Sequence, residues 1–342
     1  MDGVRGIAAL MVMWHHYFDS EPIRSASPLI RFISRFAGIG QTGVDLFFVL
    51  SGFLITRILL GTKSEPRYFE KFYVRRSLRI LPLYYVFLLL FLYVQPRLVG
   101  SKPPDLSSCW WWLVYLQNIP LSFGIAATGP IHYWSLAIEE HFYLFWPLLV
   151  FLISRRALAA VCIALIPASI VLRAVLLRHG VDVYFFTLTR LDAISLGSLL
   201  AVIEPVLTER PVDHHRWFLR CLAAIFLLLV PVYLVFSNSN AFWLQAIKYT
   251  IFGLFFFFLL GFLITNQEDT AYSRFLSSAP MRFVGRISYG LYVYHGLCFF
   301  WVWRLFPNHG LLLLLPVAFG LVITVSYVSF RYMESPFLRL KR

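Results

Sequence analysis

Two long apolar runs constrain this chain more than any other feature. YTIFGLFFFFLLGFLIT covers residues 249–265 and GLLLLLPVAFGLVITVSYVSF covers 310–330. Each is about as long as the roughly 20 apolar residues that carry a helix across a bilayer. The chain is also 59% hydrophobic and only 14% charged, which is too apolar for an ordinary soluble domain. The sequence therefore predicts an all-α integral membrane protein.

Similar segments recur along the whole chain. Ten of them are predicted to cross the membrane, at 3–18, 40–60, 80–96, 134–153, 157–177, 187–204, 217–236, 241–265, 287–306 and 310–332. No polar stretch between them is long enough to fold alone, so we expect one helical bundle, a single transmembrane domain over 1–342 without an appended soluble domain. The segment 109–125, CWWWLVYLQNIPLSFGI, is broken by Pro120 and Gly124 and is either an eleventh span or a re-entrant or interfacial element.

The distribution of Lys and Arg decides between these alternatives. If 109–125 does not cross and the N-terminus is cytoplasmic, seventeen basic residues lie in cytoplasmic loops. Only seven then lie in outside loops: Arg24, Arg31, Arg35, Arg97, Lys102, Arg178 and Arg190. If 109–125 crosses, the asymmetry largely disappears. The positive-inside rule therefore favours ten spans with both termini in the cytoplasm.

The basic residues of the cytoplasmic loops also explain the formal net charge of +13. Nucleic-acid binding is not indicated, because the sequence shows no basic and aromatic face of the kind that it needs. The four cysteines form no C-x-x-C pair. They predict neither a metal site nor a disulfide framework.

Ionisable side chains inside the predicted spans are functional candidates, because a charge at membrane depth costs several kcal/mol. On a helix, His16 lies only about 20° from Arg5 around the axis, whereas His15 is turned about 80° away. Arg5 and His16 are about 16 Å apart along the axis, so they are predicted to line one channel with Arg5 at its mouth. An imidazole takes and returns a proton near neutral pH, which suits a general base or a nucleophile. The alternative is that both histidines only hydrogen-bond neighbouring helices.

A basic cluster follows in YFEKFYVRRSLRILP. Arg79 is four residues from Arg75 and three from Arg76, so the three guanidinium groups can converge on a helix. Guanidinium groups match phosphate oxygens in bidentate fashion, which predicts a phosphate clamp at the cytoplasmic boundary. The alternative is a topology anchor paired with lipid headgroups.

Adjacent glutamates interrupt the apolar segment HYWSLAIEEHFYLFWP. Glu139 and Glu140 point about 100° apart on a helix. One of them is predicted to face the interior, where it fixes a histidine tautomer or steers a substrate hydroxyl, while the other holds the bundle together. A purely structural pair is the alternative. Asp45, Asp192 and His295 are further ionisable candidates inside the spans, either supporting the site or structural.

Seven segments appear in a fixed order: DGVRGIAA at 2–9 with His16 beyond it, GVDLFFVLSGFLI at 43–55, RRSLRILPLYY at 75–85, YWSLAIEEHFYLFWP at 133–147, RLDAISLG at 190–197, SYGLYVYHG at 288–296 and RYMESPF at 331–337. Together they resemble the acyltransferase-3 family of integral membrane O-acyltransferases, which modify cell-surface carbohydrates and some other acceptors. The resemblance covers nearly the whole chain. His141 stands where Gln is common in the family.

The resemblance implies a multi-pass protein of the cell inner membrane that moves an acyl group, usually acetyl, from cytoplasmic acyl-CoA to a hydroxyl. Acetyl-CoA is then a co-substrate, and no tightly bound cofactor is expected. By motif match His16 is the catalytic histidine and Arg5 its partner, while Glu334 matches an acidic motif residue. Further matches concern the acyl-CoA site: Arg75, Arg76, Arg79, Ser51 and Gly52. Candidate donors to the developing oxyanion are Arg5, Trp134, Tyr143 or a backbone N–H near Ser51 and Gly52.

A rival interpretation is a proton-coupled transporter of a small solute or glycan precursor, because such carriers also use buried His, Asp and Glu. The sequence shows no inverted repeat to support it. An assembly or scaffold protein would need neither a deep histidine nor a triple arginine. The loops 19–39 and 97–133 carry no interpretable motif, so the acceptor and the oligomeric state stay open.

Overall fold

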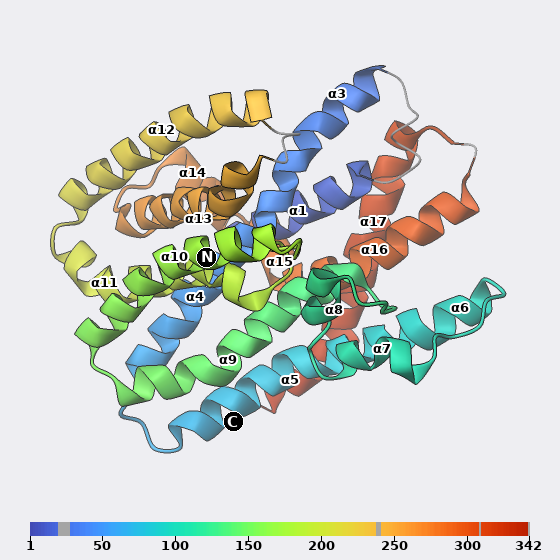
Figure 1. The fold of residues 1–342 in the computed structure, drawn as a ribbon, viewed down its shortest axis with the longest axis horizontal. Helices are drawn as coiled ribbons and strands as arrows, with labels where there is room; N and C mark the ends of the chain where they lie inside the picture. The colour runs from blue at the N-terminus through green and yellow to red at the C-terminus, as the bar shows by residue number, and fades with distance from the viewer. Residues whose placement is uncertain (20–27, 237–240, 308, 341–342) are drawn as a thin grey trace. The chain divides into compact units, whose positions relative to one another are not determined.

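A computed structural model describes residues 1–19, 28–236, 241–307 and 309–340, and every regular element among them is helical (Figure 1). The α-helices are α1 (Asp2–Phe18), α3 (Pro28–Ala37), α4 (Gly43–Thr62), α5 (Tyr68–Leu89), α6 (Gln95–Leu98), α7 (Leu106–Leu113), α8 (Asn118–Phe123), α9 (Trp134–Leu152), α10 (Arg155–Arg178), α11 (Leu191–Glu209), α12 (Pro211–Phe236), α13 (Phe242–Thr265), α14 (Ala271–Ser277), α15 (Ala279–Arg286), α16 (Ser288–Leu305), α17 (Leu311–Ser329) and α18 (Ser335–Arg339). Short 3₁₀ turns are η1 (Gly38–Thr42), η3 (Ile131–Tyr133) and η4 (Thr187–Thr189), and π-helical stretches are η2 (Leu90–Val94) and η5 (Phe330–Glu334). The predicted all-α class is confirmed for this part of the chain.

Within the described residues, seven helical stretches are long and apolar enough to cross a membrane: Phe32–Thr62, Tyr68–Leu98, Ile131–Leu152, Arg155–Arg178, Leu191–Glu209, Phe242–Thr265 and Leu311–Arg339. The chain is therefore a multi-pass membrane protein. The other three predicted spans, 3–18, 217–236 and 287–306, lie on α1, α12 and α16. The total of ten spans and the cytoplasmic termini stay predictions. Arg24, Lys341 and Arg342, which the charge argument counts, lie outside the described residues.

The ambiguous segment 109–125 is not one long helix. It is divided between α7, of eight residues, and α8, of six. At about 1.5 Å per residue neither helix approaches the thickness of a bilayer. Gly124 ends α8 in the left-handed conformation, with φ of 65°, which glycine adopts without steric strain.

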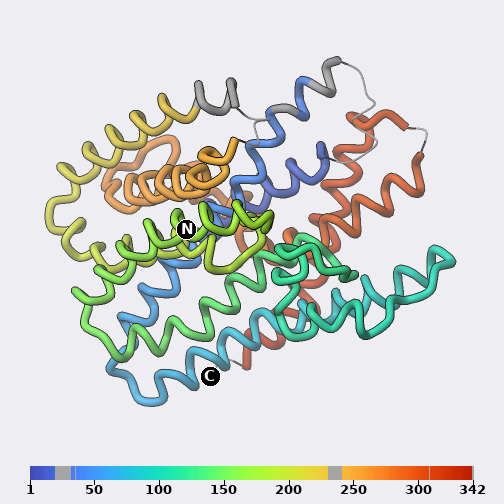
Figure 2. Tube along the Cα trace, viewed as in Figure 1, coloured from blue at the N-terminus to red at the C-terminus, as the bar shows by residue number. Residues whose placement is uncertain are grey.

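Both π-helical stretches have the same local cause. η2 ends at Val94, two residues before Pro96, and η5 ends at Glu334, two residues before Pro336. A proline has no N–H for the carbonyl four residues earlier and its ring clashes with that carbonyl, so the helix widens locally instead of breaking. Figure 2 follows the chain from α5 through η2 into α6 as one continuous rod.

The described contacts divide the chain into two compact units that interleave in sequence. Unit 1 contains Met1–Val44, Phe69–Leu106 and Thr270–Arg342, and unit 2 contains Asp45–Tyr68 and Ser107–Asp269.

Unit 1 is organised around α1, which packs against η1, α14, α15 and α16. Its small residues allow this close packing: a Cβ on Gly3 would overlap the Leu276 carbonyl of α14, and one on Gly6 would press on the backbone of Gly285 in α15. Interhelical contacts through small residues are typical of membrane bundles. α16 and α17 lie side by side (Figure 1).

In unit 2, α10, α11 and α13 pack on one another, and α12 packs on α13 (Figure 1). α4 approaches α11 through two reciprocal glycines. A Cβ on Gly52 would overlap the Ile194 carbonyl, and one on Gly197 would overlap the Val49 carbonyl. The motif glycine Gly52 therefore has a packing reason to be glycine.

Candidate functional site

In unit 1 the candidate histidine, His16, is half-buried near the end of α1. Its Nδ1 lies 3.0 Å from the backbone oxygen of Val12, one turn earlier. A carbonyl oxygen only accepts hydrogen bonds, so Nδ1 must carry the proton. In the neutral ring Nε2 then holds the lone pair. The local fold therefore favours the neutral tautomer whose lone pair is on Nε2.

The structure brings a second imidazole to His16. His295 on α16 is fully buried, and its ring centroid lies 4.8 Å from that of His16. Its Nδ1 lies 2.6 Å from the Tyr292 backbone oxygen, so this ring has the same tautomer. The His15 ring lies 5.2 Å from His16.

Arg5 lies on the same continuous helix as His16, near its other end. Its Nη1 contacts Asp2 Oδ1 at 3.1 Å, an ion pair one turn apart that is partly exposed. Asp2 and Arg5, the first charged residues of the motif, therefore interact with each other.

The basic cluster lies on α5, which begins at Tyr68, twelve residues before the predicted span. Arg75 is exposed, whereas Arg76 and Arg79 are half-buried. The Arg79 guanidinium interacts electrostatically with the Glu334 carboxyl. Glu334 is buried and accepts a hydrogen bond from Ser329 Oγ at 3.4 Å. Two predicted site residues, Arg79 and Glu334, are thus neighbours.

In unit 2 three predicted residues form a hydrogen-bonded chain between α4 and α9. Ser51 Oγ donates to Glu139 Oε1 at 2.7 Å and lies 2.8 Å from the Tyr143 hydroxyl. Because the single Ser51 hydroxyl proton goes to Glu139, Tyr143 is the donor in the second bond. Glu140 is half-buried on an adjacent face of α9.

His141, the departure from the family pattern, also has a polar partner. Its Nδ1 lies 2.8 Å from Thr187 Oγ1, which also accepts a hydrogen bond from Asn118 Nδ2 at 2.6 Å. This histidine therefore links α9 to η4.

Asp45 pairs with an arginine that the sequence argument had placed in an outside loop. Arg190 Nη2 lies 2.6 Å from Asp45 Oδ1, and both side chains are buried. Aromatic ring centroids surround the Arg190 guanidinium carbon at 4.1 to 5.9 Å: Tyr249, Tyr184, Phe48 and Trp134. Such rings attract a cation through their π faces. We call this group the Arg190 cage; it includes the candidate Trp134.

A second buried ion pair adjoins the cage. Arg173 Nη2 lies 2.9 Å from Asp192 Oδ2, and neither side chain is exposed. Arg173 also donates to the backbone oxygens of Ala246 and Thr189 and to the Thr250 hydroxyl. The sequence reasoning missed Arg173 and Arg190. An arginine inside the predicted span 157–177 was a signal that could have identified Arg173.

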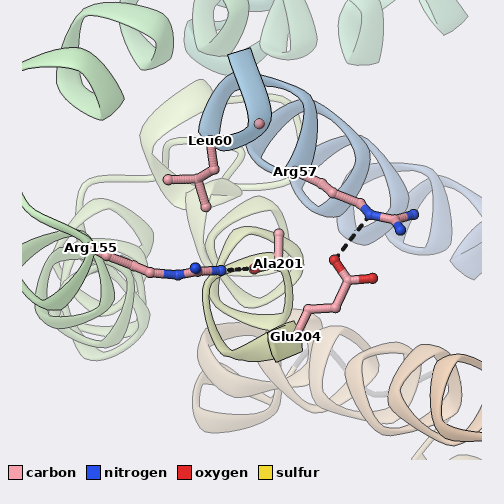
Figure 3. Close-up of a pocket in the computed structure, with 6 residues that line it drawn as sticks. Arg57, Leu60, Arg155, Ala201 and Glu204 are labelled. Atoms are coloured by element: carbon pink, nitrogen blue, oxygen red, sulfur yellow. Dashed lines mark hydrogen bonds and ion pairs between the residues drawn. The ribbon is translucent and has the colours of Figure 1, made fainter. Parts of the chain in front are cut away.

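A cavity of about 220 Å³ in unit 2 is lined by Arg57, Leu60, Gly61, Arg155, Ala201 and Glu204 (Figure 3). Arg57 Nε pairs with Glu204 Oε2 at 3.0 Å. Arg155 donates to the backbone oxygens of Val202 and Ala201 at 2.8 and 3.3 Å. The Ala201 carbonyl has no helical N–H partner, because residue 205 is proline. Arg155 replaces that partner, so this wall of the cavity is part of the helix packing.

Within the described part of the chain, no group of three or more His, Cys, Asp or Glu side chains could hold a metal ion. The candidate residues are instead acids, hydroxyls and imidazoles in hydrogen-bonded pairs and chains. Such groups can move protons and orient hydroxyls.

These features define a multi-pass, all-helical membrane protein with polar and ionisable residues buried among its helices. The acyltransferase-3 family profile, described as an acyltransferase domain, matches residues 1–331. The chain belongs to this family, and the resemblance seen in the motifs is confirmed.

Relatives with similar sequences are named as O-acetyltransferases. The chain is 31% identical to the peptidoglycan O-acetyltransferase OatA of Listeria monocytogenes over 321 residues, covering 86% of this chain and 48% of the relative. It is 31% identical to the putative peptidoglycan O-acetyltransferase YrhL of Bacillus subtilis, covering 86% and 47%. It is 28% identical to the O-acetyltransferase OatA of Staphylococcus aureus, covering 86% and 49%. The chain thus spans about half the length of these relatives. No solved structure matches it.

Proposed function

We propose that this protein is an O-acetyltransferase of the cell inner membrane. It moves an acetyl group from cytoplasmic acetyl-CoA to a hydroxyl of a cell-surface carbohydrate. The family match over 1–331 supports the reaction class. The relatives' names support acetyl as the group and peptidoglycan as the first acceptor to test.

The hydrogen bond from His16 Nδ1 to Val12 carries the mechanistic part of the proposal. Nε2 accepts the proton of the acceptor hydroxyl while the hydroxyl oxygen bonds to the thioester carbonyl carbon. The carbon–sulfur bond then breaks, the electron pair leaves with sulfur, and the proton passes from Nε2 to sulfur to give free CoA. In a second route Nε2 attacks the thioester carbonyl carbon and the carbon–sulfur bond breaks, with its electron pair leaving on sulfur. The acceptor hydroxyl oxygen then takes the acetyl group from Nε2, and its proton goes to the CoA thiolate. Both routes are ordinary acyl transfer.

The arginines of α5 are proposed to bind the acyl-CoA phosphates. Arg75 is exposed, and Arg76 is half-buried above the Phe72 ring at 6.0 Å. Arg79 has a carboxylate neighbour in Glu334. We therefore assign the phosphate contacts mainly to Arg75 and Arg76, and the positioning of Glu334 to Arg79.

The test is acetyl transfer by the purified protein in detergent, with acetyl-labelled CoA and glycan fragments as acceptors. His16→Ala should lower transfer by about 10²-fold or more, the range that a positioned base contributes. The matched control is His15→Ala, the neighbouring imidazole, which should stay within a few-fold of wild type. Both variants must elute as folded monodisperse protein.

Full transfer by His16→Ala would remove this histidine from the mechanism. Movement of a solute across vesicles in the absence of CoA, without loss of label from CoA, would support the transporter interpretation instead.

A further inference from the structure

Two imidazoles from distant parts of the sequence meet in unit 1. His16 and His295 are 279 residues apart in the chain, yet their ring centroids lie 4.8 Å apart with the planes tilted by 47°. Each ring donates Nδ1–H to a backbone oxygen of its own helix, at Val12 and at Tyr292. In both neutral rings the lone pair is therefore on Nε2.

The geometry allows these rings to share a proton. A ring nitrogen lies about 1.1 Å from its centroid, so a centroid distance near 4.8 Å permits a nitrogen-to-nitrogen separation close to about 3 Å. A protonated His16 can then donate from Nε2 to the lone pair of His295. Two neutral rings of this tautomer have no proton to place between them, so the bond forms only after His16 has taken a proton.

The surroundings of His295 suit this role. It is fully buried, with the rings of Tyr292 and Phe299 each 5.9 Å away. Little water competes there for the proton, and hydrogen bonds are electrostatically stronger than in water. Among the described residues, the other groups that act electrostatically on His16 are His15 on its own helix and Asp19 directly after that helix. Gly40 of η1, which lies against His15, carries no charge.

We propose that His295 is a positioning residue for acetyl transfer: it accepts a hydrogen bond from protonated His16 and holds that ring until the proton passes to the departing sulfur. The inference rests on the proposed function, because it assigns His295 a role in the same reaction. No bond to His295 forms or breaks, and the proton count of the reaction is unchanged.

Two variants separate this role from packing. His295→Asn keeps a donor near the position of Nδ1 but has no acceptor at the position of Nε2, whereas His295→Gln places an amide near Nε2. We expect kcat to fall about 10- to 100-fold in the Asn variant, with KM for acetyl-CoA and acceptor within about twofold of wild type. The kcat of the Gln variant should be at least threefold higher than that of the Asn variant. His15→Asn, whose ring is a similar distance from His16, is the matched control and should leave kcat unchanged.

A second readout is independent of acetyl transfer. Diethyl pyrocarbonate modifies unprotonated imidazole, and mass spectrometry of the α1 peptide in a His15→Asn background reports on His16 alone. The modification rate is followed over a pH titration. Loss of His295 should leave more His16 unprotonated at the acidic end of the titration, so His16 should react at least threefold faster there in the Asn variant and less so in the Gln variant.

The outcomes are distinguishable. Unchanged kcat and unchanged His16 modification in the Asn variant would overturn the inference, as would equal losses in the Asn and Gln variants. If wild-type protein transfers no acetyl group but His16 modification still depends on His295, the histidine pair stands and the proposed function fails. If only the Gln variant folds, a kcat loss as large as that of His16→Ala would overturn it.

Discussion

The Arg190 cage gives a stability prediction with a definite magnitude. The Arg190 side chain is fully buried, and Asp45 is the only hydrogen-bonding partner of that side chain among the described residues; its Nε and Nη1 have none. Asp45→Asn removes the opposing charge from a guanidinium that water does not reach. Removing one partner of a buried pair costs about 3–5 kcal/mol. The four rings remain in the variant, so we expect about 3 kcal/mol, the lower end of that range.

Asp192→Asn is the matched control, because Arg173 keeps its hydrogen bonds to two backbone oxygens and to Thr250. We expect a smaller loss, of about 1–2 kcal/mol. The double variant Asp45→Asn with Arg190→Met removes both charges and should lie within about 1–2 kcal/mol of wild type.

The assay is the free energy of unfolding in bicelles, from reversible SDS titration followed by circular dichroism. A loss below about 1 kcal/mol for Asp45→Asn, or a larger loss for Asp192→Asn, would refute the reasoning. So would a double variant whose loss equals the sum of the losses measured for Asp45→Asn and Arg190→Met separately.

Two further predictions use the same assay. Gly197→Ala places a Cβ against the Val49 carbonyl and should lower the free energy of unfolding by about 1–3 kcal/mol. In the control Gly320→Ala the new Cβ meets no atom within 4 Å, so this variant should be neutral or slightly stabilising. Equal effects of the two variants would contradict the close approach of α4 and α11. Arg155→Ala removes the donor to the Ala201 carbonyl, which Pro205 leaves without a helical N–H, and should lower the free energy of unfolding by about 1–3 kcal/mol. The loss should be distinctly smaller in a Pro205→Ala background, where residue 205 supplies the N–H. An unchanged loss in that background would show that Arg155 does not act through this carbonyl.

Much of the fold could be predicted from the sequence, because apolar length reports directly on helices in a bilayer. Each predicted span lies on a helix of the structure. The broken segment 109–125 was recognised as irregular from Pro120 and Gly124. In the structure Gly124 ends α8 and Pro120 lies in the first turn of that helix. The start of α5 was not predicted, because Tyr68 to Arg79 is polar and its helix extends beyond the apolar stretch.

The site was less accessible from sequence, because its contacts join residues far apart in the chain. Helical spacing placed Arg5 and His16 on one stripe, but no periodicity could reveal that His295 lies against His16. Ser51 and Glu139 were both named, yet their hydrogen bond spans 88 residues. Local patterns identify which side chains are costly in a membrane, while the tertiary fold decides which partners reduce that cost.

Arg190 shows how such a partner changes an argument made from sequence. The positive-inside rule counts cations that remain in aqueous loops, and Arg190 was one of seven assigned to the outside. In the structure it is buried and paired with Asp45, so it is a constituent of the helix packing and not a loop cation. Arg155, which the same count places in a cytoplasmic loop, also donates to backbone oxygens of α11 and so takes part in the helix packing. A charge count made from the sequence therefore includes arginines that the fold has already paired, and the orientation with both termini in the cytoplasm stays a prediction.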